Sequence, residues 1–171
     1  MSDPRSPGDE LPGDPGAGGL SHIDATGAAR MVDVGGKSVS DRVAVAGGTF
    51  RTTAQVIDAL SDGALAKGDA LATARIAAIM GAKRTPDLIP LCHQVALSSV
   101  TVDFAIAPES IDVTATAATS DRTGVEMEAL TAVAVAGLTL HDMVKALDPW
   151  ASMTDIRLLT KSGGKRGIWT R

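Results

Sequence analysis

The sequence predicts one α+β domain with an antiparallel sheet and helices packed on one of its faces. Segments that alternate apolar and polar residues, rich in Val, Ile and Thr, are interleaved with segments whose apolar residues recur at helical spacing. From Val43, and leaving out one short helix, their order is β-α-β-β-α-β, the split β-α-β arrangement of ferredoxin-like folds. A chain of 171 residues with 44% hydrophobic content is long enough to bury a core.

The first elements are two strands and a short helix. Ala29–Val34 and Val43–Phe50 have strand-like composition, and the Gly47-Gly48 pair in the second predicts a β-bulge. Thr53–Leu60 follows with the apolar spacing of a short helix. We therefore expect two strands before the first helix.

A second helix and a hairpin come next. Asp69 is a suitable N-cap for the segment DALATARIAAIM, and Gly81 is a suitable C-terminal stop. Val95–Ala107 and Ser110–Thr119 both alternate, and the Pro108-Glu109 turn between them predicts an antiparallel hairpin.

The last part contains a long helix and a final strand. Val125–Leu147 is predicted to be helical over about 35 Å. Thr154–Thr160 is predicted to be a strand, followed by the basic, glycine-rich loop KSGGKRG. One stripe of the long helix is apolar and is expected to face the core: Leu130, Val133, Gly137, Leu140, Val144 and Leu147.

Residues 1–20 differ in composition from the rest of the chain. They hold four of the eight prolines and five glycines, so we expect a disordered Pro/Gly-rich tail followed by a single domain over residues 21–171. We find no apolar run of about 18 residues and no signal-peptide pattern. The only cysteine, Cys92, cannot form an internal disulfide, which favours a cytoplasmic location and no membrane association.

Composition also excludes several partners. The net charge is −4 and aromatic residues make up only 2%, so neither phosphate attraction nor base stacking favours nucleic-acid binding. The three histidines and Cys92 lack zinc-ligand spacing, so no metal site and no cofactor are expected. A core built from small side chains gains stability from self-association, which hints at an oligomer.

Five local patterns are candidates for chemistry, three of them outside the start of the long helix and the basic loop. Lys67 precedes a helix N-terminus, where an anion between the two would be stabilised; the alternative is a solvated lysine in a turn. Cys92 is expected to be a small, buried apolar side chain. His93, on a loop, is better placed for acid–base catalysis or hydrogen bonding. Asp142 and Lys145 are spaced i, i+3, the spacing of a weak surface ion pair.

The start of the long helix and the basic loop are the remaining candidates. Thr123 and Glu126 have the spacing of a capping box, which leaves Glu128 unexplained. The loop from Lys161 to Gly167 can offer backbone N–H groups and positive charge to phosphate, although a flexible basic turn is the alternative. The loop does not match the P-loop pattern, so a Walker-type hydrolase is not supported.

These segments together resemble the cyclic pyranopterin monophosphate synthase family (MoaC), which acts in molybdenum cofactor biosynthesis. The matching stretches are SHIDATGAARMVDVGGK, KGDALATARIAAIMGAKRTPDLIPLCH, TGVEMEALTAVAVAGLTLHDMVKALD and LLTKSGGKRG. The resemblance implies a ferredoxin-like subunit in a homohexamer, a trimer of dimers, with active sites at dimer interfaces. It implies a lyase that converts 3′,8-cyclo-7,8-dihydroguanosine 5′-triphosphate to cyclic pyranopterin monophosphate and pyrophosphate.

The resemblance also implies roles for individual residues. The catalytic residues are Asp142, Lys145 and Lys161. The residues of the substrate pocket are Leu91, Cys92, His93, Met127, Glu128, Glu126, Lys67 and Arg42. Gln94 replaces the family's usual proline and Val144 its usual cysteine, and neither change removes an ionisable catalytic group.

Three other classes of protein are alternatives. A non-catalytic nucleotide-binding module on the same fold needs the basic loop but not the catalytic set. An RNA-binding domain of the RRM type needs aromatic residues on its strands, and the predicted strands offer only Phe50 and Phe104. A purely structural oligomer leaves the clustered ionisable motifs unexplained.

Overall fold

The computed structural model describes residues 28–165 and 167–171. The predicted tail, residues 1–20, lies outside them. The described residues up to Val32 fall in one unit, and Asp33–Arg171 forms another, which contains every helix and strand that the structure describes. These elements are β1 (Ser40–Arg51), α1 (Ala54–Ser61), α2 (Ala70–Lys83), α3 (Thr85–Leu88), β2 (Leu97–Ala107), β3 (Ser110–Asp121), α4 (Glu126–Val144), β4 (Ser152–Ser162) and β5 (Trp169–Thr170).

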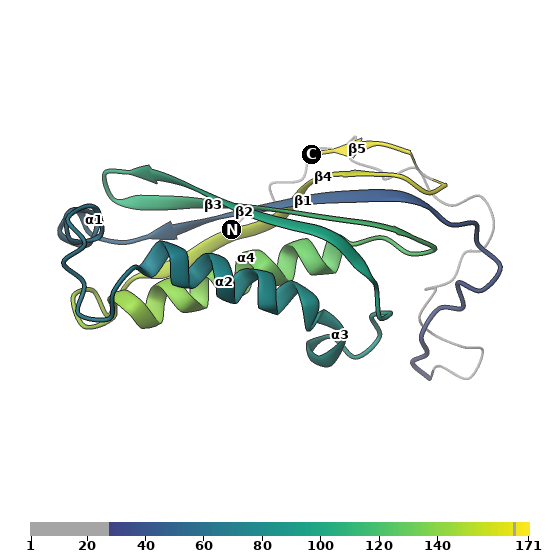
Figure 1. Cartoon of the computed structure of the whole chain (residues 1–171), viewed down its shortest axis with the longest axis horizontal. Helices are drawn as coiled ribbons and strands as arrows, with labels where there is room; N and C mark the ends of the chain where they lie inside the picture. The colour runs from purple at the N-terminus through teal and green to yellow at the C-terminus, as the bar shows by residue number, and fades with distance from the viewer. Residues whose placement is uncertain (1–27, 166) are drawn as a thin grey trace, which may run out of the picture. The chain divides into compact units, whose positions relative to one another are not determined.

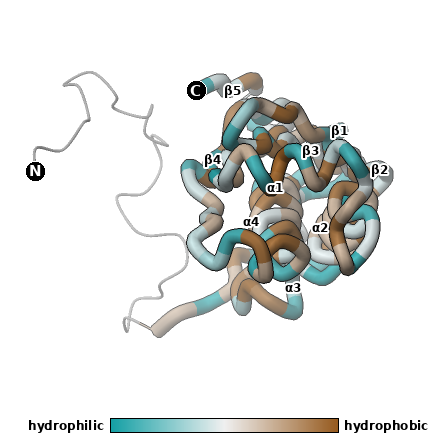
Figure 2. Tube along the Cα trace, turned by 90° about the vertical axis from the view of Figure 1, so that its left-hand side faces the viewer, coloured by the Kyte–Doolittle hydropathy of each residue, from teal (hydrophilic) through white to brown (hydrophobic). Residues whose placement is uncertain are grey.

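The five strands form one sheet in the order β2-β3-β1-β4-β5, and every neighbouring pair is antiparallel. Helices α2 and α4 pack against each other and against one face of this sheet (Figure 1). The end-on view in Figure 2 shows the same two layers. The predicted α+β fold with helices on one face is therefore confirmed, and β5 is a short edge strand that the sequence did not predict.

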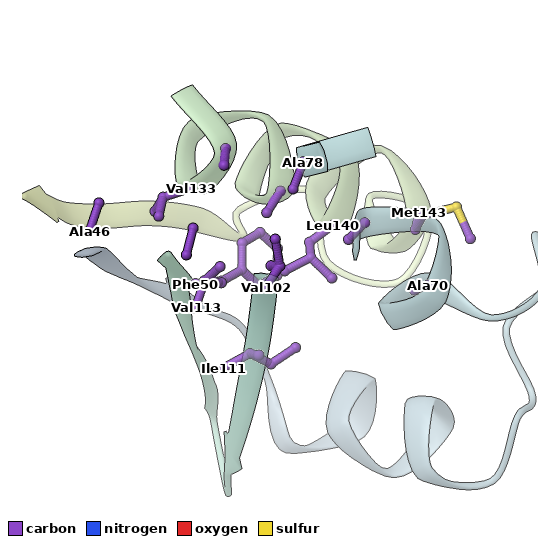
Figure 3. Packing of buried hydrophobic residues seen from close by; sticks show 14 of the residues in the cluster. Ala46, Phe50, Ala70, Ala78, Val102, Ile111, Val113, Val133, Leu140 and Met143 are labelled. Carbon is purple, nitrogen blue, oxygen red and sulfur yellow. The ribbon is translucent and has the colours of Figure 1, made fainter. Parts of the chain in front are cut away.

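The core lies between the sheet and the two long helices. Phe50 of β1 is fully buried, and Val102, Val113 and Leu140 are buried with it from β2, β3 and α4 (Figure 3). Most other core side chains are alanines or valines. Small side chains allow α2 and α4 to approach each other closely.

Gly81 shows how close that approach is, and it corrects a prediction. The sequence predicts that Gly81 ends the second helix, but α2 continues to Lys83. A β-carbon on Gly81 would lie 2.7 Å from Cγ2 of Val135 in α4. The glycine therefore provides packing space inside a helix and does not terminate it.

Two further expectations need correction. Residues 28–39 contain no strand, only a single bridge residue at Ala29, and Met31 is 54% exposed, so the segment Ala29–Val34 buries little apolar surface. The long helix ends at Val144 and not at Leu147, which lies beyond it and is exposed. The rest of the predicted stripe does face the core, with Leu130 half-buried.

The irregularity predicted at Gly47-Gly48 is present, but on one side only. The pairing of β1 with β3 is continuous, whereas its pairing with β4 shifts register at Val45/Ala46 and at Gly47/Thr49. Asp155 of β4 adopts a left-handed backbone at this point, with φ of 56°.

Helix α4 is the one helix in the described part of the chain that is long and apolar enough to span a membrane. It packs against α2 and three strands, and more than half of it is buried inside the fold. Burial in a protein core accounts for its apolar composition, so no membrane span is indicated.

Candidate active site

The first cluster of charged residues, which we call the Asp142 cluster, consists of Lys67, Asp142 and Lys145. Lys67 Nζ donates to Oδ2 of Asp142 at 2.6 Å and to its backbone carbonyl at 2.8 Å. Lys145 Nζ donates to Oδ1 at 2.7 Å. All three side chains are about half exposed, so the cluster is open to a ligand.

The sequence explains why Lys67 is held at the end of α4. It lies in the α1–α2 connection, where Leu65 is buried and Gly68 has a φ of 87°. Asp69 then caps α2 by accepting from the backbone N–H of Ala72 at 2.9 Å, as predicted. These neighbours fix the loop on both sides of Lys67.

The charge balance of the Asp142 cluster favours anions. Hydrogen bonds from Lys145 and then from Lys67 lower the pKa of Asp142 to about 2, so its carboxylate stays ionised at ordinary pH. One carboxylate shared by two ammonium groups leaves a net positive charge. An exposed pair of lysines with excess positive charge is suited to binding phosphate groups.

The second cluster, which we call the Glu126 cluster, consists of Glu126, Glu128 and Lys161 at the other end of α4. Lys161 Nζ of β4 donates to Oε1 of Glu126 at 2.9 Å. The predicted capping box is wrong, because the N-cap of α4 is Val125 and no side chain bonds there. The Glu126 carboxylate is instead directed to Lys161.

Glu128 is almost fully buried, at 3% exposure. Burial raises its pKa, and the negative charge of Glu126 adds to the rise against the opposing effect of a backbone hydrogen bond at Glu128. Burial also raises the pKa of the Cys92 thiol, with a further contribution from the charge of Glu128. Cys92 is half-buried in the connection from α3 to β2, and because the charge of Glu128 reaches its thiol, this part of the connection lies near the Glu126 cluster.

Arg42 of β1 anchors the same end of the sheet. Its Nε and Nη2 donate to the backbone carbonyls of Asp121 and Arg122 at 3.1 and 3.2 Å, just before α4. Gly163 and Gly164 have φ of 95° and 71° and pass so close to β1 that a β-carbon on Gly164 would overlap the Arg42 guanidinium. The start of α4 and the loop after β4 are thereby joined through Arg42.

The remaining predicted site residues lie around these groups. Met127 is 36% exposed between the two glutamates of the first turn of α4. Lys165 is exposed in the loop after β4, and Arg166 lies outside the described residues. Among the residues that the structure describes, no three His, Cys, Asp or Glu side chains are placed to hold a metal ion.

The two clusters do not meet within one chain. Asp142 follows Glu126 by sixteen positions on α4, which corresponds to about 24 Å along the helix axis. In Figure 1, α1, which precedes the loop of Lys67, and α3, which precedes the segment of Cys92, lie at opposite ends of the helical layer. Sequence spacing predicts the Asp142–Lys145 pair but carries no signal for the Lys67–Asp142 contact, which joins residues 75 positions apart.

The segment of the chain that matches a known protein family includes both clusters. The model of the MoaC family matches residues 31–164. The chain belongs to the MoaC family. Within it, the chain is 62% identical over 155 residues to "Cyclic pyranopterin monophosphate synthase 2" of Mycobacterium bovis, with 91% of this chain and 93% of the relative covered. It is 57% identical over 162 residues to "Cyclic pyranopterin monophosphate synthase" of Streptomyces avermitilis, with 95% of both chains covered.

Proposed function

We propose that this MoaC chain is a cyclic pyranopterin monophosphate synthase of molybdenum cofactor biosynthesis. It converts 3′,8-cyclo-7,8-dihydroguanosine 5′-triphosphate to cyclic pyranopterin monophosphate with release of pyrophosphate, which makes it a lyase, and it acts in the cytoplasm. The observation that carries the proposal is the pair of clusters, one cationic and one carboxylate-rich, in a chain 57–62% identical to relatives with that name.

Each part of the chemistry draws on groups from both ends of α4. Lys67, with the basic loop around Lys165, holds the triphosphate, because preorganised cations stabilise phosphate charge as pyrophosphate leaves. Lys161 and Lys145 carry out the proton transfers that the ring rearrangement requires, and Asp142, whose carboxylate stays ionised, tunes these lysines.

The pocket is completed at the Glu126 cluster. Glu128 and His93 position the pterin and ribose edges of the substrate, and Glu126 orients Lys161 through their 2.9 Å bond. Four further residues complete the walls of the same pocket: Leu91, Cys92, Met127 and Arg42.

Each complete site is formed by two chains. A distance of about 24 Å between the clusters is too long for one small substrate to bridge, so the Asp142 cluster of one chain meets the Glu126 cluster of a second. The assembly is a homohexamer, a trimer of dimers. Large apolar side chains that are exposed on the helical layer support self-association, because exposed apolar surface is typical of protein interfaces. They are Ile76 and Met80 of α2, Leu88 of α3 and Leu138 of α4.

The direct test is to incubate the purified protein with the cyclised dihydro-GTP and to measure pyrophosphate and the pterin product. We expect both products from the wild type and neither from Lys161→Ala, which should keep its fold and assembly. Binding of the triphosphate without pyrophosphate release by the wild type would instead indicate a non-catalytic nucleotide-binding module.

A further inference from the structure

Gly124 lies two residues before Glu126, in the turn between β3 and α4. The three heavy atoms closest to a β-carbon built on Gly124 all belong to the carboxyl group of Glu126. The β-carbon would overlap Oε2 and would lie 2.8 Å from Cδ and 3.1 Å from Oε1. The carboxyl group therefore occupies the space that any other residue at position 124 would fill with its side chain.

Backbone conformation does not explain this glycine. Gly163 and Gly164, in the loop after β4, have positive φ angles that other residues rarely adopt. Gly124 is not among the positive-φ glycines of the described residues, so its backbone is open to alanine. What matters at position 124 is the missing side chain.

The orientation of the Glu126 carboxyl group has a direct consequence for Lys161. With Oε2 above Gly124, Oε1 accepts a hydrogen bond from Lys161 Nζ at 2.9 Å. Both side chains are only about 30% exposed, so solvent competes weakly for the bond. A β-carbon at position 124 would force the carboxyl group to move and would disturb this pair.

We infer that Gly124 is a positioning residue: by leaving room for the Glu126 carboxylate, it aims that carboxylate at Lys161 and fixes where the Lys161 ammonium lies. The inference rests on the proposed function, in which Lys161 transfers a proton to or from the substrate. Gly124 acts on that step only through Glu126 and Lys161, because it has no side chain of its own to reach the reacting atoms.

The experiment compares Gly124→Ala with Glu126→Gln, with the double variant, and with Gly36→Ala as a matched control. Gly36 has no heavy atom within 4 Å of its built β-carbon and no positive φ, so alanine there should behave as wild type. We expect Gly124→Ala to lower kcat roughly tenfold to a hundredfold, as a misplaced catalytic group does, with KM changed much less. We expect the double variant to be no slower than Glu126→Gln, because both changes act through one carboxylate.

A crystal structure of Gly124→Ala separates this inference from the proposed function. We expect an unchanged fold with Glu126 Oε1 and Lys161 Nζ beyond hydrogen-bond distance. An intact pair in that structure, wild-type kcat, or losses that multiply in the double variant would each overturn the positioning role. A wild type that releases no pyrophosphate would refute the proposed function, and the structure of the variant would still decide what Gly124 does.

Discussion

Lys161 and Asp142 lie at opposite ends of α4, each held there by an ion pair. Lys161 is paired with Glu126 at the start of the helix, and Asp142 is paired with Lys67 and Lys145 near its end. The helix that forms the centre of the core thus also sets the separation of the charged groups. A rigid spacer of this length requires a second chain if both clusters act on one substrate.

Mixed oligomers test the shared site. Asp142→Asn and Lys161→Ala should each abolish product formation alone, because each removes one half of every site. If the halves come from two chains, a mixed dimer regenerates one intact site, so random reassembly should restore about a quarter of the wild-type activity. The measurement is pyrophosphate release after the two inactive variants are unfolded together and refolded.

The control for this experiment is to refold each variant alone and then mix the two without exchange. Activity only after joint refolding supports a site between subunits. If the mixture stays inactive although mixed oligomers form, the two clusters do not combine into one site between two chains.

Lys67→Ala should weaken binding of the triphosphate. Lys67 supplies one of the two ammonium groups of the Asp142 cluster, and a charge-assisted contact to phosphate is worth about 1.5–3 kcal/mol, or roughly tenfold to a hundredfold in affinity. Calorimetric titration with inorganic pyrophosphate measures the effect. Lys37→Ala, at an exposed position before β1, is the matched control and should bind like wild type. Unchanged affinity in Lys67→Ala would show that Lys67 pairs with Asp142 but does not bind the triphosphate.

Asp142→Asn should have the opposite effect on binding. Removing the carboxylate frees two lysines for an anion, so affinity for pyrophosphate should rise several-fold while turnover is lost. Because the pKa of Asp142 is about 2, the carboxylate is ionised throughout the usable pH range. The variant should therefore bind pyrophosphate more tightly than the wild type at pH 5 as well as at pH 8. A gain that disappears at pH 5 would contradict this assignment.

Glu128→Gln should raise the melting temperature at neutral pH by a few degrees. Burial raises the pKa of Glu128 above its ordinary value of 4.5, so its ionisation at higher pH costs folding stability. The cost is absent below the ordinary pKa and grows as pH rises through the raised value. Thermal unfolding should therefore show equal stability near pH 4 and a more stable variant at pH 7.

The matched control is Glu109→Gln, the same chemical change in the exposed turn between β2 and β3. Its effect on the melting temperature should be small and should not grow between pH 4 and pH 7. A Glu128→Gln variant that is less stable than the wild type at pH 7 would show that the buried carboxylate makes a net favourable interaction.

Local features of the fold could be predicted from the sequence. The alternation on both sides of Pro108-Glu109 fixes the hairpin of β2 and β3, because strand faces repeat every two residues. The N-cap at Asp69 depends on a contact three residues away. Both patterns are complete within a few residues, so no knowledge of the rest of the chain is needed.

Contacts between distant residues could not be predicted in the same way. The helix stop predicted at Gly81 is wrong, because the reason for the glycine is the close approach of Val135 from another helix, and this approach cannot be recognised in the local sequence. The capping box suggested by the spacing of Glu126 is wrong for a similar reason, because the partner of its carboxylate, Lys161, lies 35 positions later in the chain. The resemblance to the MoaC family located the charged residues, and the structure shows which of them are held together.

Gly81→Ala should destabilise the fold, unlike an alanine at Gly124. A β-carbon at position 81 would lie 2.7 Å from Cγ2 and 3.0 Å from Cβ of Val135, and Cβ cannot move without its backbone. Overpacking of this kind costs about 1–3 kcal/mol of unfolding free energy. Urea unfolding measures it, and the double variant Gly81→Ala/Val135→Ala, which removes the opposing methyl groups, should recover much of the loss. A single variant as stable as the wild type would show that α2 and α4 can separate at little cost.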